Sequence, residues 1–144
     1  MAELLARDAI RLDERAGSRD EAISRCGAVL VEIGAVAPAY VDAMLAREQS
    51  VSTYIGEGVA IPHGTLNSKE SVQRDALAVL RFPEGVDWDG FDVRVCVAIA
   101  AAGDGHVDIL AQLATVLMDP AQAQRLREST SVDDVITILE GNPT

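Results

Sequence analysis

His63 is one of only two histidines in the chain, and it lies in a segment whose residue types suit phosphoryl transfer. It stands between Pro62 and Gly64, directly after the short apolar run Val59–Ile61. This pattern predicts a histidine on a turn just past the end of a short strand, with its ring facing outward. A neutral imidazole is a nucleophile near neutral pH, so such a ring could accept and hold a phosphoryl group.

Three side chains that precede His63 could assist this chemistry. The guanidinium of Arg47 matches the oxygens of a migrating phosphoryl group, and Ser52 and Thr53 carry small hydroxyl groups. The residue types alone are also compatible with a His63 that has no catalytic role. A histidine in a P-H-G turn is often an ordinary solvated loop residue.

The amino-acid sequence of the segment Arg47–Thr65 closely resembles the active-site segment of a known family. The segment runs R-E-Q-S-V-S-T-Y-I-G-E-G-V-A-I-P-H-G-T. That family is the enzyme IIA component of the bacterial sugar phosphotransferase system, mannitol/fructose class. The resemblance extends from about Ala9 to about Leu139. Tyr54 makes the segment more similar to the mannitol branch than to the fructose or nitrogen-regulatory branches, which more often carry glycine there.

The resemblance implies a function and its partners. His63 would accept a phosphoryl group from the phosphocarrier protein HPr, through its Nε2 nitrogen, and pass it to a cysteine of enzyme IIB. Arg47 matches the arginine of the family's R-E pair, and Thr53 and Glu57 would support the site, Glu57 by holding a ring or an arginine in place. The resemblance implies neither a metal nor another cofactor.

His106 is the second candidate in the site. It lies in G-D-G-H-V-D-I-L-A-Q-L-A, directly after a predicted strand and in the first turn of a predicted helix, where free amides favour an anion. Ligand sites of α/β sheets gather beyond the carboxyl ends of strands, so both histidines are expected at one edge. The alternative is a helix-start residue satisfied by water. The family resemblance places this histidine beside the nucleophile.

Alternation of strand and helix patterns predicts the fold that positions these residues: a single three-layer α/β domain over residues 1–144, with a mixed, mostly parallel sheet and helices on both faces. The predicted strands are Ala9–Leu12, Val59–Ile61, Ala76–Phe82 and Val93–Ala101. The predicted helices begin at the capping box Ser18–Glu21, at Pro38, near His106, at Pro120 and at Ser131.

The sequence also predicts the structure of two connecting segments and the role of Trp88. Leu66–Arg74 is polar and predicts a loop, and Pro83 is expected to stop the strand before it. Pro83–Gly90 then predicts a turn. Trp88, within it, is expected to pack over the sheet edge rather than to serve as a ligand platform.

Composition restricts the partners and the compartment. The net charge of −11 argues against nucleic acid or an anionic membrane surface as a partner. The longest apolar run, Val95–Ala102, is far shorter than the roughly 20 residues of a membrane span. No signal peptide is apparent, so a cytoplasmic protein is expected. Cys26 and Cys96 fall in core patterns and predict buried free thiols.

Two other functions stay open at this stage. One is a regulatory protein of the nitrogen-regulatory type, in which the phosphohistidine switches binding to a target protein. The other is a small acidic binding domain whose histidines are incidental. The sequence does not identify the sugar or polyol, because the sugar-recognising pocket of these systems lies on another component.

Overall fold

The computed structural model describes residues 5–101 and 105–139; residues 66, 67, 69 and 105–109 are described by their backbone alone. A five-stranded sheet in the order β1-β4-β5-β3-β2 forms its middle layer. The strands are β1 (Leu5–Arg11), β2 (Tyr54–Gly56), β3 (Val59–Ala60), β4 (Ala76–Trp88) and β5 (Phe91–Ala100). The α/β domain expected from the sequence is confirmed.

Strand directions in this sheet are evenly mixed rather than mostly parallel. β1 with β4 and β3 with β5 run parallel, whereas β4 with β5 and β2 with β3 run antiparallel. The difference arises because β4 and β5 are joined by a tight hairpin at Asp89 and Gly90, which have positive φ angles of 56° and 96°. The parallel pair β3–β5 brings the carboxyl ends of those two strands to the same edge.

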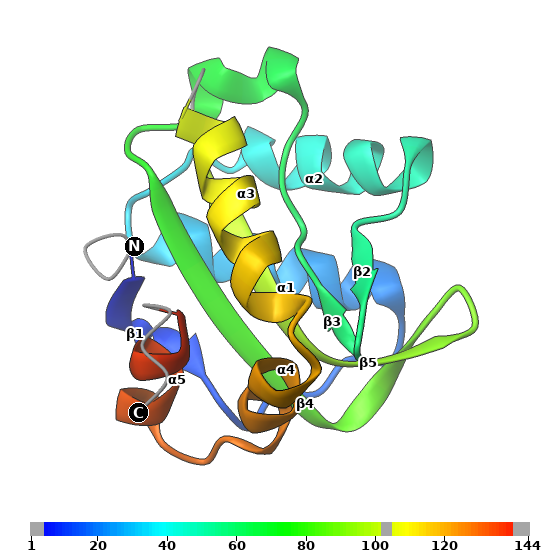
Figure 1. The fold of residues 1–144 in the computed structure, drawn as a ribbon. Coiled ribbons are helices and arrows are strands. Elements are labelled where there is room, and N and C mark those ends of the chain that lie inside the picture. Colours follow the sequence, from blue (N-terminus) through cyan, green and yellow to red (C-terminus); the bar gives the residue numbers. More distant parts are fainter. Residues whose placement is uncertain (1–4, 102–104, 140–144) are drawn as a thin grey trace.

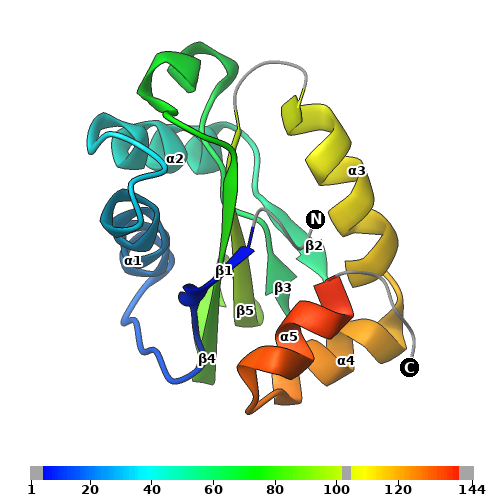
Figure 2. The same ribbon diagram turned by 90° about the vertical axis from the view of Figure 1, so that its left-hand side faces the viewer.

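Helices cover both faces of the sheet (Figures 1 and 2). On one face lie α1 (Arg19–Glu32) and α2 (Ala39–Ser50). On the other lie α3 (Gly105–Leu117), α4 (Pro120–Glu128) and α5 (Val132–Leu139). Alternate residues of β5 supply the two cores: Cys96, Ala98 and Ala100 face α1 and α2, and Val95, Val97 and Ile99 face the opposite helices. None of the helices in the described part of the chain is long and apolar enough to cross a membrane.

The helix starts follow the predicted capping signals. The Ser18 side chain accepts a hydrogen bond from the amide of Glu21 at 3.1 Å. The carboxylate of Glu21 reaches back to the amide of Gly17, one residue earlier than a capping box requires. Pro38 directly precedes α2, and Ser131 accepts from the amide of Asp134 at 3.3 Å at the start of α5.

Pro83 does not end its strand, contrary to the sequence prediction. β4 continues through it to Trp88, because the ladder with β5 shifts register between Arg81 and Val86. Within that bulge Pro83 has no ladder partner that would require an N–H group.

Other differences between the predicted and observed elements are smaller. β1 begins at Leu5 rather than Ala9, and Leu66–Ser71 forms a short 3₁₀ helix, η2, rather than a loop.

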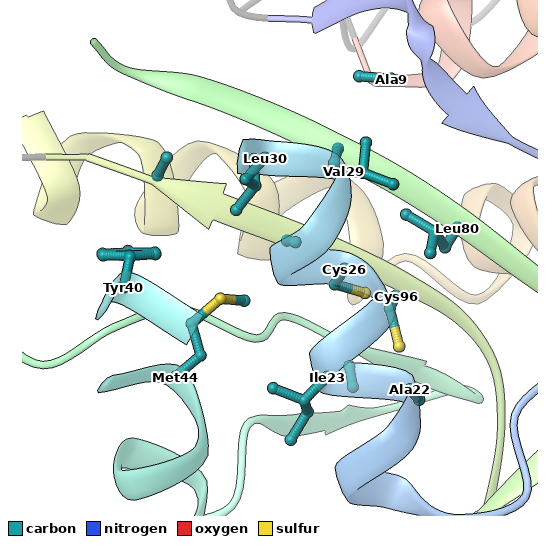
Figure 3. Packing of buried hydrophobic residues seen from close by; sticks show 14 of the residues in the cluster. Ala9, Ala22, Ile23, Cys26, Val29, Leu30, Tyr40, Met44, Leu80 and Cys96 are labelled. Carbon is teal, nitrogen blue, oxygen red and sulfur yellow. The ribbon is translucent and has the colours of Figure 1, made fainter. Parts of the chain in front are cut away.

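The buried sides of two helices pack against the sheet and its neighbours. In α2 the buried residues are Tyr40, Met44 and Glu48. In the part of α3 whose side chains are described, Leu113 and Leu117 are buried, while Met118, which follows the helix, is 62% exposed. Figure 3 shows Tyr40 and Met44 on α2 beside the residues of α1 and β5.

Cys26 and Cys96 are fully buried free thiols, as predicted. They come from α1 and β5 and lie next to each other in the core (Figure 3). Burial, together with the neighbouring Cys26 thiol, raises the pKa of Cys96 well above its ordinary value. The Cys96 sulfur is therefore a protonated, apolar core group at neutral pH.

Candidate functional site

His63 lies just beyond β3, at the edge of the sheet where β3 and β5 both end. It forms a parallel bridge to Ile99, and the amide of Ile99 donates to the carbonyl oxygen of Pro62 at 2.9 Å. The position just past a strand end is as predicted. The outward-facing ring is not, because His63 is only 6% exposed in the isolated chain. The Pro62–Gly64 turn is packed against β5 and α2 rather than projecting into solvent.

One hydrogen bond of the His63 ring determines which nitrogen can react. Nδ1 lies 2.7 Å from the carbonyl oxygen of Ile61. A carbonyl oxygen can only accept, so Nδ1 carries the proton in this contact. In the neutral ring the lone pair then belongs to Nε2, which makes Nε2 the nucleophilic nitrogen.

Ile61, whose carbonyl oxygen orients the His63 ring, is itself hydrogen-bonded to the segment before β2. The amide of Ile61 donates to the carbonyl oxygen of Thr53 at 3.0 Å. Thr53 is 4% exposed, and both its amide and its hydroxyl donate to the carboxylate of Glu48, at 3.0 Å and 2.5 Å. The backbone around His63 is therefore linked through Thr53 to the last turn of α2.

Glu48 is a buried carboxylate, 3% exposed, that joins three segments. Besides the two donors of Thr53, its oxygens accept from the hydroxyl of Ser52 at 3.1 Å and from the indole Nε1 of Trp88 at 2.6 Å. Four donors compensate the cost of taking this group out of water. Trp88 is thus a packed core residue, in line with the predicted packing role, and also a hydrogen-bond donor to this network.

Tyr40, at the other end of α2, holds the turn on the opposite side of His63. Its hydroxyl donates to the carbonyl oxygen of Ile99 at 2.8 Å and accepts from the amide of Gly64 at 2.9 Å. A Cβ atom at Gly64 would lie 2.6 Å from the Tyr40 ring and 2.5 Å from the Ser68 hydroxyl. Only glycine lets the turn approach Tyr40 this closely.

Arg47 lies at the carboxyl end of α2, where the sequence predicted it. Its Nη1 donates to the carbonyl oxygen of Val51 at 2.6 Å, so the guanidinium caps the helix. His106 lies in the first turn of α3, shortly after β5 ends, at the same edge of the sheet as His63. Its side chain is outside the described residues.

Glu57 is placed at the far end of β3 from His63. It occupies the turn between β2 and β3 with a φ of 57°, and its carboxylate lies 3.9 Å from Nη1 of Arg127. The arginine beside Glu57 is therefore Arg127 of α4 and not Arg47.

Sequence reasoning did not find Tyr40 or Glu48. The available signal was their spacing: with Met44 they form an i, i+4, i+8 stripe along α2. An apolar pattern search passes over a glutamate in such a stripe. Among the side chains that the structure describes, no group of three or more His, Cys, Asp or Glu residues could hold a metal ion.

Comparison with known proteins identifies the family. Residues 3–142 match the family model described as phosphoenolpyruvate-dependent sugar phosphotransferase system, EIIA 2. The chain is 41% identical over 140 residues to the mannitol-specific phosphotransferase enzyme IIA component of Staphylococcus aureus strain MRSA252, covering 97% of each protein. It is 43% identical over 142 residues to the multiphosphoryl transfer protein of Escherichia coli O157:H7, but spans only 38% of that protein.

Solved structures agree with this. The crystal structure of IIA mannitol from Escherichia coli superimposes with a TM-score of 0.85 at 37% identity, covering 93% of this chain and 97% of the other. The nitrogen regulatory protein IIA-Ntr from Neisseria meningitidis gives a TM-score of 0.82 at 29% identity, covering 96% and 97%. The resemblance seen in the sequence is confirmed: the chain belongs to the EIIA 2 family of the phosphoenolpyruvate-dependent sugar phosphotransferase system and is of the mannitol type.

Proposed function

We propose that this protein accepts a phosphoryl group from phosphorylated HPr on Nε2 of His63 and passes it to a cysteine of an enzyme IIB domain. The transfer would be coupled to uptake and phosphorylation of mannitol or a related sugar. The observation that carries the proposal is the 2.7 Å contact from Nδ1 of His63 to the carbonyl oxygen of Ile61, which leaves the lone pair on Nε2.

Each transfer exchanges one bond to phosphorus for another. Nε2 of His63 attacks the phosphorus carried by the HPr histidine, and the phosphorus–nitrogen bond to HPr breaks as the bond to His63 forms. A IIB cysteine thiolate then attacks the same phosphorus, and the bond to His63 breaks. The displaced histidine recovers its lone pair in each step, so nothing is oxidised or reduced.

The protein contributes position and charge to these steps. Tyr40 and Thr53 fix the backbone on either side of His63 through the contacts described above. In the proposal, Arg47 and His106 stabilise charge on the phosphoryl oxygens during transfer. The positive end of α3 at His106 favours the same anion.

The partners are proposed from the family and from one solved relative. A complex of Escherichia coli IIA mannitol with phosphorylated IIB mannitol contains a IIA chain that matches this one with a TM-score of 0.86 at 37% identity, covering 94% and 96% of the two chains. This supports a IIB domain as the acceptor here. These partners imply a cytoplasmic protein.

A labelling experiment tests the proposal. The protein is incubated with enzyme I, HPr and phosphoenolpyruvate carrying labelled phosphate, and the label is located by peptide mapping. We expect label on His63 that survives alkali and is lost in mild acid, because protonation of the phosphoramidate nitrogen makes it a good leaving group. No label is expected on His63→Ala. Acid-stable label on serine or threonine, or full labelling of His63→Ala, would refute the proposal.

A second step separates transport from the regulatory alternative. Labelled protein is mixed with a mannitol-type IIB domain, and transfer to the IIB cysteine is measured. Rapid transfer supports the transport role. Labelling of His63 without any transfer to IIB would favour a phosphohistidine switch instead.

A further inference from the structure

A surface pocket of about 650 Å³ lies at the end of the sheet remote from His63. It is bordered by Gly58, which precedes β3, whereas His63 follows β3. Three arginines from three elements line it: Arg81 of β4, Arg94 of β5 and Arg127 of α4. This volume is within the range of small-molecule sites. Three carboxylates, those of Glu57, Asp92 and Glu128, line the same pocket, so its binding capacity depends on which guanidinium groups they leave without a partner.

The β4 bulge builds one wall of this pocket. Residues 82–85 of β4 stand opposite Arg94 alone, because Arg81 pairs with Val95 and Val86 with Val93. Arg94 occupies the bulge, donating from Nη1 to the carbonyl oxygen of Pro83 at 2.6 Å and from Nε to Asp92 at 2.8 Å. Bulges often direct a side chain toward a functional site.

Two glycines make room for the arginines. Gly85 has a φ of 80°, and a Cβ atom there would lie 2.2 Å from Oδ1 of Asp92, the partner of Arg94, and 3.0 Å from Nε of Arg94 itself. Gly58 has a φ of 74°, and a Cβ atom there would lie 2.9 Å from Cδ of Arg127. Any other residue would be strained at either position, and its Cβ would displace the Asp92–Arg94 pair at Gly85 or the Arg127 side chain at Gly58.

Arg81 differs from the other two arginines because it has no carboxylate partner within the described residues. Arg94 pairs with Asp92, and Arg127 with Glu57. The Nη1 of Arg81 makes one long hydrogen bond, 3.3 Å, to the carbonyl oxygen of Arg127, and its Nε is buried without an acceptor. A buried donor left unsatisfied is costly, so turning this guanidinium toward an anion in the pocket would be favourable.

We propose that this pocket binds a small phosphate-bearing anion, with Arg81 as its principal ligand. Guanidinium groups that approach from three elements suit a tetrahedral phosphate, which accepts hydrogen bonds in several directions; a planar carboxylate is satisfied by one fork. Glu128, also on the rim, is exposed and can turn into solvent. The proposal is independent of phosphoryl transfer at His63.

Amide NMR shifts of the full chain test the site. Inorganic phosphate is titrated against sodium chloride of equal ionic strength, with citrate as a polycarboxylate probe. We expect saturable phosphate shifts at residues 57–58, 81–82, 84–85, 92–94 and 127–128, and weaker effects of citrate. Shifts that chloride reproduces, shifts confined to residues 61–64, or tighter binding of citrate than of phosphate would overturn the proposal.

Variants separate binding from a purely structural role. Arg81→Gln should lower phosphate affinity about tenfold or more, since it removes a charged donor. Arg127→Gln provides a second test if Arg81→Gln folds poorly. Arg19→Gln is the control, because Arg19 pairs with Asp20 and Asp89 in a different surface hollow and should leave affinity unchanged. Folded Arg81→Gln and Arg127→Gln variants that bind phosphate as the unmodified chain does would overturn the assignment.

Discussion

The amide of Gly64 donates a 2.9 Å hydrogen bond to the phenol oxygen of Tyr40, whose own proton goes to the carbonyl oxygen of Ile99. The residue next to His63 is thereby connected to the neighbouring strand through a side chain of α2. A single hydroxyl group satisfies two buried backbone groups, so removing it should alter the position of the turn that carries His63.

Tyr40→Phe tests this connection. We expect a loss of about 1–3 kcal/mol of unfolding free energy, because an amide and a carbonyl lose their partner in the interior. Phosphoryl acceptance by His63 should slow about tenfold, since the turn is less well positioned. Urea unfolding and rapid-quench labelling measure the two effects. Tyr54→Phe is the control: it removes one 3.3 Å hydrogen bond from Gly58 and should cost no more than about 0.5 kcal/mol. Equal effects of the two variants would contradict the assignment to Tyr40.

Glu48→Gln tests the network that reaches Ile61. The amide presents one acceptor oxygen where the carboxylate presented two, so part of the donor set from Thr53, Ser52 and Trp88 loses its partner. We expect destabilisation of about 1–3 kcal/mol and a change in the nitrogen-15 shifts of the His63 ring as its tautomer becomes less uniform.

The matched control for that variant is Glu32→Gln. Glu32 forms a surface ion pair with Arg11 at 3.0 Å and has 64% of its side chain exposed, so its loss should cost at most about 0.5 kcal/mol. A stable Glu48→Gln variant with an unchanged His63 spectrum would show that Thr53 holds its position without the carboxylate.

His106→Ala should separate transfer from folding. The residue lies in the first turn of α3, so its removal should change stability by no more than about 1 kcal/mol. Both half-reactions should slow by about an order of magnitude or more if the ring donates to the phosphoryl oxygens during transfer. Slow labelling of His63 should persist, in contrast to His63→Ala. Quench-flow measurement of acceptance from HPr and donation to IIB decides this, and normal rates in both would make His106 a bystander.

Alkaline pH should destabilise the protein. Burial raises the pKa of Tyr40 and, more strongly, that of Cys96. The native state then keeps protons that the unfolded chain releases, so the contribution to stability is complete below the ordinary pKa values, about 8.5 for cysteine and 10 for tyrosine, and declines above them. Urea unfolding at increasing pH measures this. Tyr40→Phe should show a shallower decline above about pH 10. An unchanged unfolding free energy across this range would contradict the prediction.

Local signals in the sequence were sufficient for the helices and for the position of His63. Ser18, Pro38 and Ser131 mark helix starts that the structure contains, because capping depends on neighbouring residues alone. β4 was predicted too short because its continuation past Pro83 depends on the register of β5, a distant partner. The same limit applies to the burial of His63, which follows from packing against residues remote in sequence.

Tyr40 and Glu48 are eight positions apart on α2, and each holds one side of the His63 turn through the contacts described above. Eight residues of helix span about 12 Å and leave the two side chains about 80° apart around the helix axis, within one broad buried stripe. Insertion or deletion of one residue between them would rotate one end by about 100° relative to the other and disconnect either Gly64 or Thr53. We therefore expect the length of this helical segment to tolerate change far less than the identity of its exposed residues.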